Sequence, residues 1–494
     1  MSIGFIRYRV KCGKEYASFC KAERRDGCKT NNEIHLGRVI DKEKGVFRNR
    51  ERGLFTFSID KGYGDCIEYP EYIAQEKLLL DFGDSWLLSK LLESSGVLPI
   101  FQKLLPMQTD TLMSLLFYRI LGSKCASKYA LTWWEGSYAR QLFPKAQLLS
   151  QRISDFYKQL GDVQVLRTFF NAYLPIVSPK SDCGVLIDST GLPNDIDFPL
   201  TAVNVHNGVV SQEMRLILVL DKNTKMPLYF RYVAGNIVDV STLKTTLSEL
   251  RLFGISVNHA IIDAGYYSGD NLDELRDSSI PYLVRVKANL KMFKNLVKDH
   301  SADLETSRNA VIYRDRIVYI KCVPITEEGT VLSYAYLALD VDGKHEQKVK
   351  FLHKNLSNQK LKPEEIDAEI REMGLFALLS SQLLDTNEVL PLYYMRQAIE
   401  QVFDISKNYA ELLPLRVHSE QALRGHLLIS FIATVLLVYT NQQLEGSANN
   451  FTSAFLKLRN LKCKVFDSVT VVAEPTKQMK DIIKHLKLSL PETI

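Results

Sequence analysis

The chain has 494 residues, of which 46% are hydrophobic and 24% charged, as in a soluble globular protein of about two to four domains. This composition excludes a disordered or fibrous chain. The net charge is +5, yet residues 1–53 alone hold 14 Lys and Arg against 7 Asp and Glu. We therefore expect a polyanion contact near the N-terminus; the alternative is a basic, solvated sheet face without a partner.

The cysteines predict neither a zinc site nor a disulfide framework. All eight lie far apart, without a Cys-x2-Cys pair or a Cys/His cluster at zinc spacing. A reduced, cytoplasmic location fits this pattern best. The N-terminus lacks the apolar core of a signal peptide. The longest apolar run, residues 427–439, is too short to span a bilayer, so we expect a buried helix and no membrane partner.

The periodicity of the apolar residues changes along the first third of the chain. Short alternating runs in residues 3–57 predict a small basic antiparallel sheet. From about residue 81 the apolar residues recur at helical spacing, which predicts a helical module over residues 81–175. This module contains either a helix-turn-helix that reads DNA or a plain helical spacer.

Two apolar, strand-like runs each end in an aspartate, Asp188 and Asp263. Two further strand-like runs and one helical stretch lie between them, so the order is strand, strand, strand, helix, strand. This is the order expected of an RNase H-like core, in which the first and fourth strands are neighbours. We therefore expect the two aspartates to lie side by side. Taken singly, each aspartate is also explained as a turn former at a strand end or as a helix N-cap.

The segment after Asp263 contains a basic strip and more strand-like runs. Two such runs, at residues 310–319 and 331–339, predict a β-rich subdomain inserted over residues 300–373. The basic strip just before it either follows a phosphate backbone or is the solvated face of a helix; its members are Arg285, Lys287, Lys291, Lys294 and Lys298.

A short stretch further on carries a regular pattern of charges. At about 100° per residue, Tyr393, Arg396, Glu400 and Lys407 fall within one narrow stripe of a helix. This face presents a carboxylate between two cations. The alternative is a solvated amphipathic face with a weak ion pair between Arg396 and Glu400. Asp385 and Glu388 are placed to form a capping box for this helix. Because proline is tolerated only near a helix start, the alternative is that the regular helix begins close to Pro391.

These motifs together resemble the catalytic core of DDE transposases of bacterial insertion sequences, of the insertion-sequence-4 type. The motifs are Tyr-x2-Arg-x3-Glu-x6-Lys, Val-Leu-Ile-Asp188-Ser-Thr and Ile-Ile-Asp263-Ala-Gly-Tyr-Tyr-Ser. The element Gly235-Asn236-x-x-Asp239 is similar to one found in a branch of that group. The resemblance covers roughly residues 181–440.

The resemblance implies a catalytic site and a reaction. Asp188, Asp263 and Glu400 would be catalytic carboxylates that hold two Mg²⁺ or Mn²⁺ ions, with Asp188 bridging both. Hydrolysis of a phosphodiester at an element end would free a 3′-hydroxyl, which then attacks a target strand. Arg396 and Lys407 would hold DNA phosphate near the cut, and Tyr393 would help to position it. A homodimer on double-stranded DNA, in the cytoplasm at the nucleoid, is expected.

We therefore predict an α/β chain with an RNase H-like catalytic core, preceded by a small basic β domain and a helical module. Two other functions stay open: a catalytically silent, transposase-derived DNA-binding protein, and an RNase H-like nuclease that cuts without joining. The expected parts are a basic β-rich domain (1–65), a helical module (81–175), the first part of the core (181–299), a β-rich insertion (300–373), the second part of the core with the signature helix (374–445) and a C-terminal segment (446–494).

Overall fold

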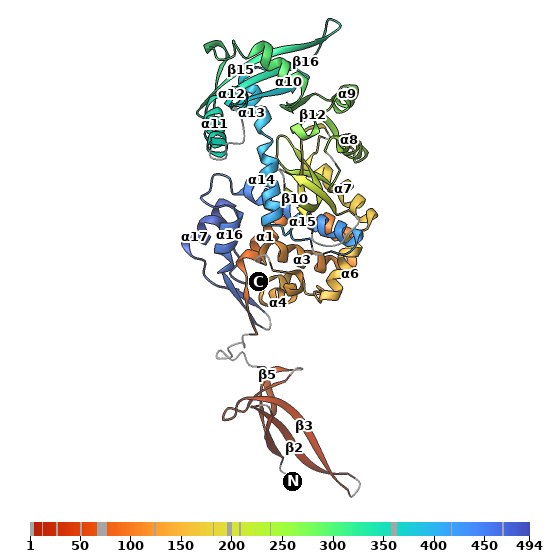
Figure 1. Cartoon of the computed structure of the whole chain (residues 1–494). Coiled ribbons are helices and arrows are strands. Elements are labelled where there is room, and N and C mark those ends of the chain that lie inside the picture. The colour runs from red at the N-terminus through yellow and green to blue at the C-terminus, as the bar shows by residue number, and fades with distance from the viewer. Residues whose placement is uncertain are drawn as a thin grey trace. The chain divides into compact units, whose positions relative to one another are not determined.

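The chain is mixed α/β, and its described strands form three sheets of six, ten and three strands (Figure 1). The computed structural model describes all residues except 1–3, 12, 26–27, 50–51, 67–76, 123–124, 181, 195–199, 207–208, 238, 357–362, 416 and 467–468. Several positions of the predicted basic sheet, and Val238 of the Gly235–Asp239 element, therefore lie outside the described residues. Two units are distinguished, Met1–Lys77 and Leu78–Ile494.

The first unit is an antiparallel sheet whose strands follow one another in chain order. Alternation of side chains places Leu36, Phe47, Phe55 and Phe57 in one buried cluster with Ala17. This cluster is separate from the core of the second unit. The strands are β1 (Phe5–Lys11), β2 (Lys14–Arg25), β3 (Cys28–Asp41), β4 (Val46–Asn49), β5 (Gly53–Ser58) and β6 (Gly62–Cys66).

The ten-stranded sheet organises the second unit. Its order is β11-β10-β8-β12-β13-β17-β16-β15-β14, and β9 pairs with β10. Strand β12 runs parallel to both β8 and β13, whereas the other pairs are antiparallel. The strands are β8 (Asp182–Pro193), β9 (Ala202–His206), β10 (Val209–Asp221), β11 (Pro227–Ala234), β12 (Ser256–Ile262), β13 (Tyr282–Val286), β14 (Ala310–Tyr313), β15 (Arg316–Glu327), β16 (Thr330–Asp340) and β17 (Leu375–Ser380).

The strands predicted as an inserted subdomain join this sheet edge to edge. Strand β16 pairs antiparallel with β17, with Tyr334 opposite Ser380 and Leu339 opposite Leu375. The buried run Ala335–Leu339 continues the apolar core across that junction, which is why the segment does not stand apart. Helices of this region are α8 (Leu243–Leu252), α9 (Gly269–Asp277), α10 (Lys291–His300), α11 (Val341–Leu356) and α12 (Pro363–Glu372), with the 3₁₀ turns η3 (Asp239–Thr242), η4 (Ala264–Tyr266) and η5 (Ser307–Asn309).

The remaining helices of the second unit come before β8 or after β17 in the chain. They are α1 (Gly83–Ser94), α2 (Leu98–Leu104), α3 (Thr109–Leu121), α4 (Ala130–Gly136), α5 (Ala139–Leu142), α6 (Ser150–Leu160), α7 (Val163–Val177), α13 (Thr386–Tyr394), α14 (Gln397–Asn408), α15 (Glu420–Gln443), α16 (Phe451–Arg459) and α17 (Lys477–His485), with η1 (Pro106–Gln108) and η2 (Ser127–Tyr129). Strand β18 (Lys462–Val465) pairs with β7 (Leu78–Asp81) and β19 (Thr470–Val472).

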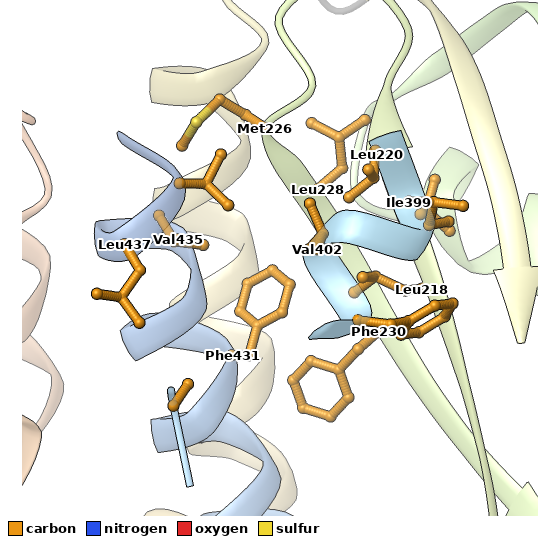
Figure 2. Packing of buried hydrophobic residues seen from close by; sticks show 14 of the residues in the cluster. Leu218, Leu220, Met226, Leu228, Phe230, Ile399, Val402, Phe431, Val435 and Leu437 are labelled. Atoms are coloured by element: carbon orange, nitrogen blue, oxygen red, sulfur yellow. The ribbon is translucent and has the colours of Figure 1, made fainter. Parts of the chain in front are cut away.

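Helix α15 is central among these helices. By length and composition it could cross a membrane, but 89% of its most apolar window is buried inside the chain. Figure 2 shows Phe431 and Val435 of α15 beside Val402 of α14 and the sheet residues Leu218 and Phe230. The predicted buried helix at residues 427–439 is thus confirmed. Burial of these side chains holds α14 against the sheet. Truncating one of them to alanine typically lowers the free energy of unfolding by about 2–5 kcal/mol.

A backbone contact between α6 and α15 gives the first testable prediction. A Cβ atom on Gly425 would lie 2.0 Å from the carbonyl oxygen of Tyr157, a backbone atom that cannot swing away. Gly425→Ala is therefore expected to destabilise the protein by about 1–3 kcal/mol in denaturant unfolding. Gly136→Ala is the matched control, because a Cβ atom there meets nothing within 4 Å. Equal stability of the two variants would contradict this packing.

Candidate active site

The two aspartates lie side by side on neighbouring parallel strands. Asp263 directly follows the last residue of β12, as predicted, whereas Asp188 lies inside β8, which continues to Pro193 because residues 188–193 pair with β10. In the β8–β12 pair, Ile187 lies opposite Ile262, so the next residues, Asp188 and Asp263, follow side by side. Asp188 accepts a hydrogen bond from the amide of Ser189 at 2.8 Å. Asp263 precedes η4 at its N-cap position, but its side chain makes no capping hydrogen bond. The cap explanation therefore fails for Asp263, whose carboxylate faces other partners.

The signature residues lie on two helices, not on the single helix predicted from their spacing. Helix α13 ends at Tyr394, and α14 begins at Gln397. Between them, the amide of Arg396 bonds to the carbonyl of Tyr393 at 3.1 Å, a tight i to i+3 turn that breaks the helical phase. Tyr393 thus lies in the last turn of α13, whereas Glu400 lies in the first turn of α14 and Lys407 in its last turn.

The start of α13 follows the cap at Asp385, the first of the two expected positions. The helix begins at Thr386 rather than near Pro391, which lies inside it. The side chain of Asp385 caps the helix by accepting a hydrogen bond from the amide of Asn387 at 2.8 Å. A capped start upstream lets Pro391 sit in the second turn, where its missing N–H costs one hydrogen bond.

Arg396 contacts all three carboxylates. Its Nη1 donates to Oδ2 of Asp188 at 2.6 Å, and its Nη2 donates to Oε1 of Glu400 at 3.0 Å. The same Nη2 lies 3.7 Å from Oδ1 of Asp263. The Arg396 side chain is 18% exposed, so this guanidinium is the shared counter-ion of three acidic groups in a partly dry site. We call Asp188, Asp263 and Glu400 the carboxylate triad.

The electrostatics of the triad reflect burial and mutual repulsion. Burial raises the pKa of Asp188 to about 7; Arg396 opposes this shift, and the neighbouring Asp263 adds to it. Burial also raises the pKa of Tyr393 far above its usual range, with Asp263 as the next cause. The Tyr393 hydroxyl therefore stays protonated, and it donates to Oδ1 of Asp263 at 3.3 Å. The site thus gathers three acidic side chains around one guanidinium.

The triad is suited to hard cations by its donor atoms. Carboxylate oxygens are the ligands that Mg²⁺ and Mn²⁺ prefer. Among the described residues, no three His, Cys, Asp or Glu side chains stand as a ready-made metal cluster. The reason is local: the Arg396 guanidinium lies between the carboxylates. The residues fit a divalent cation once that side chain is displaced.

Lys407 reaches strand β8 from the end of α14. Its Nζ donates to Oγ1 of Thr190 at 2.6 Å, two residues beyond Asp188. Burial lowers the pKa of Lys407, and the carboxylate of Glu213 opposes this shift. The last signature residue is thereby attached to the same strand as the first aspartate.

A second polar network contacts β8 at the residue after Asp188, and it was not predicted. Ser189 Oγ donates to Oδ1 of Asp239 at 2.5 Å, and Arg215 pairs with Oδ2 of Asp239 at 3.2 Å. A Cβ atom on Gly265 would lie 2.7 Å from that carboxylate, so the turn after Asp263 packs directly on it. Asp239 therefore contacts both the residue after Asp188 on β8 and the turn after Asp263. In the sequence, the Gly235–Asp239 motif could have pointed to Asp239 as a site residue. No sequence pattern pointed to Arg215.

The basic strip divides in the structure. Arg285 is exposed on β13 and lies close enough to lower the pKa of Tyr393 in part. Lys291, Lys294 and Lys298 are exposed on α10, whose Phe293 and Leu296 are buried. The structure records no contact that brings Lys287 or Lys291 to the carboxylate triad. Arg285 is thus the member of the strip with a recorded electrostatic effect on a signature residue.

Comparison with known proteins finds one matching family model and a similar solved structure. A family model described as a transposase DDE domain matches residues 179–436, which is more than half of the chain. No curated protein matches the chain. Among solved structures, the chain is similar to the piggyBac transposase in its synaptic complex with hairpin DNA, with a TM-score of 0.42 and 10% identity over 83% of this chain and 86% of that one.

Proposed function

The chain belongs to the transposase DDE domain family, and from this premise we propose that it is a metal-dependent transposase that cleaves DNA at element ends and joins them to target DNA. The observation that carries the proposal is the convergence of Asp188, Asp263 and Glu400 on one guanidinium. Three carboxylates, one inside β8, one directly after β12 and one on α14, share a single cationic centre. Such an arrangement is costly unless a cation is part of the function.

The finer assignment rests on the strand order and the signature. The strand order around β8 and β12 supports an RNase H-like core, and the Tyr393, Arg396, Glu400 and Lys407 spacing supports the insertion-sequence-4 type. We propose that the protein acts as a homodimer on double-stranded DNA in the cytoplasm, at the nucleoid. Binding of two DNA ends by two copies would place both cleavage events in one complex.

The carboxylate triad would hold the metal, as two Mg²⁺ or Mn²⁺ ions with Asp188 shared between them. When bound, the ions supply charge stabilisation to the phosphodiester and activation of the attacking water or 3′-hydroxyl. The side chains of the protein itself position the DNA phosphates by their charge. Arg396, once released from the triad, is free to bind a DNA phosphate bidentately. Lys407 holds a second phosphate near β8, and Tyr393 fixes the carboxylate of Asp263.

Two other functions differ from this one in the products they allow. A catalytically silent DNA-binding protein would bind flanking DNA without cutting it. A nuclease of the same fold would cut but leave no joined product. The intact triad with Arg396 at its centre favours catalysis over a silent protein, because a binding role alone does not require three converging carboxylates.

The test uses the full chain, DNA from both flanks of its gene and a supercoiled target plasmid. With Mg²⁺ or Mn²⁺ we expect cleavage at defined ends followed by joined products, both removed by a chelator. Cleavage without joined products would support the nuclease alternative. Binding without cleavage under every metal condition would support the silent protein.

A further inference from the structure

A pocket of about 610 Å³ lies at the C-terminal end of α14, the helix that carries Glu400. Its lining comes from α3, η2, α6, the end of α14 and the start of α15. Lys407 belongs to both places: its Nζ donates to Thr190 on the strand of Asp188, and its side chain lines the pocket. We call this cavity the Arg119 pocket.

Arg119 lies buried in this pocket with only neutral hydrogen-bond partners. Its side chain is 3% exposed. Nη1 donates to Oγ of Ser430 at 2.7 Å and to the carbonyl of Glu411 at 3.0 Å. Nη2 donates to the Tyr157 hydroxyl at 2.9 Å and lies 3.0 Å from Nδ1 of His426. No described carboxylate is within ion-pair distance, and Nε has no hydrogen-bond partner among the described residues.

His426 holds the Arg119 guanidinium without adding charge. Its Nε2 donates to the carbonyl of Leu412 at 3.0 Å, so Nδ1 is the acceptor for Arg119. Burial and the positive charge of Arg119 lower the pKa of His426 to about 3. The imidazole is therefore neutral at physiological pH. A buried cation held only by neutral groups creates a positive field that an anion can satisfy.

The rest of the lining favours an anion of the phosphate class. Four cationic side chains are among the described lining residues, against the single carboxylate of Glu411. Two of the four, Lys128 and Lys158, are exposed at the rim, near the hydroxyls of Ser127 and Ser154. Lysine and serine side chains at a rim are the usual donors to backbone phosphate oxygens.

We propose that the Arg119 pocket binds a phosphodiester of the DNA strand that reaches the carboxylate triad. This inference rests on the proposed function and adds a second contact site to it. The pocket is larger than inorganic phosphate requires and has the size of a site for a ligand of several rings, so a phosphate enters with its sugar and base. The rim lysines contact the phosphate oxygens, and Arg119 supplies the attractive field behind them.

The first test reverses the rim charges with Lys128→Glu/Lys158→Glu in the full chain. Both residues are exposed, so the fold is preserved. Binding to a duplex from the gene's flank is measured by fluorescence anisotropy in EDTA, where no cleavage is needed. We expect the Kd for DNA to rise at least about tenfold. The slope of log affinity against log salt concentration should become shallower by about two phosphate contacts.

The matched control is Lys103→Glu/Lys145→Glu, which makes the same charge change at exposed lysines outside the pocket. We expect the control to weaken binding less than about threefold, as a loss of general attraction. If both double variants weaken DNA binding equally, or if the rim variant does not weaken it, the proposal for the Arg119 pocket is wrong. The proposed function would be unaffected by either result. Failure of the wild type to bind DNA at all would overturn both.

The second test uses the thiol of Cys125, an exposed side chain that lines the pocket. Saturating flanking DNA is expected to slow its alkylation by iodoacetamide severalfold in the wild type and not in the rim variant, as read by mass spectrometry of the Cys125 peptide. Deoxyadenosine monophosphate at millimolar concentration is the comparison ligand. Protection by the mononucleotide equal to that by DNA would assign the pocket to free nucleotides and overturn the DNA proposal.

Discussion

Asp188→Asn is expected to abolish DNA cleavage and at the same time to stabilise the metal-free protein at pH 8. Loss of one shared metal ligand removes several kcal/mol of transition-state stabilisation, so we expect the cleavage rate to fall by about three orders of magnitude or more. The stability effect has the opposite sign, because the site is arranged for charge neutralisation rather than for folding.

The sign follows from the raised pKa of Asp188, about 7 in the folded protein. Between this pKa and its ordinary value near 4, the folded protein keeps a proton that the unfolded chain releases. The contribution of Asp188 to the free energy of unfolding therefore falls as pH rises through that window. Asparagine cannot ionise and avoids the loss. The gain of Asp188→Asn over wild type should grow by a few kcal/mol from pH 4.5 to pH 8.

This prediction is checked by denaturant unfolding of both proteins in EDTA at the two pH values. Comparing the variant with wild type at each pH cancels the titration of all other groups. A stability difference that stays constant across the range would show that burial of the Asp188 carboxylate is compensated in the folded state. The electrostatic account of the carboxylate triad would then be wrong.

Arg396→Ala is expected to raise the affinity of the DNA-free protein for Mn²⁺ at least about tenfold. In the wild type, the guanidinium competes with a cation for the same carboxylates. Charge-assisted hydrogen bonds of this kind contribute about 1.5–3 kcal/mol each, and a tenfold change needs about 1.4 kcal/mol. The same variant should cleave DNA poorly, because it lacks the phosphate contact.

Free Mn²⁺ measured by electron paramagnetic resonance during a titration gives this affinity without any activity. Lys407→Ala is the matched control, since Lys407 bonds to Thr190 and not to a carboxylate of the triad. We expect the control to bind Mn²⁺ as the wild type does. Unchanged Mn²⁺ affinity in Arg396→Ala would mean that the guanidinium does not compete for the metal position.

The neighbourhood of the two aspartates was predictable from sequence. Apolar runs that reach Asp188 and Asp263 indicated that β8 and β12 are neighbours, as the structure has them. The predicted order lacked β9, and it ended the first strand at Asp188, whereas β8 continues to Pro193. Hydrophobic periodicity also placed the buried helix at residues 427–439 inside α15. Such features depend on local patterns of side chains, which a single sequence contains in full.

The contacts of Arg396 were beyond prediction for a physical reason. Helical spacing relates Arg396 to Glu400 on one helix, but the break before Gln397 and the approach of β8 decide that it also reaches Asp188. The same holds for Arg215 with Asp239, and for the pairing of β16 with β17. These contacts join segments far apart in the chain, so only the packed core specifies them.

The most direct measurement is metal-dependent nicking of the gene's flanking DNA by wild type, Glu400→Gln and Asp404→Asn. All three proteins should bind the DNA. Asp404 is an exposed carboxylate on the same helix, one turn from Glu400, and forms no ion pair with Arg396 in the structure. The account predicts Mg²⁺- or Mn²⁺-dependent nicking at a defined end by wild type and Asp404→Asn, and none by Glu400→Gln. Nicking by Glu400→Gln at the wild-type rate would contradict the assignment of the carboxylate triad.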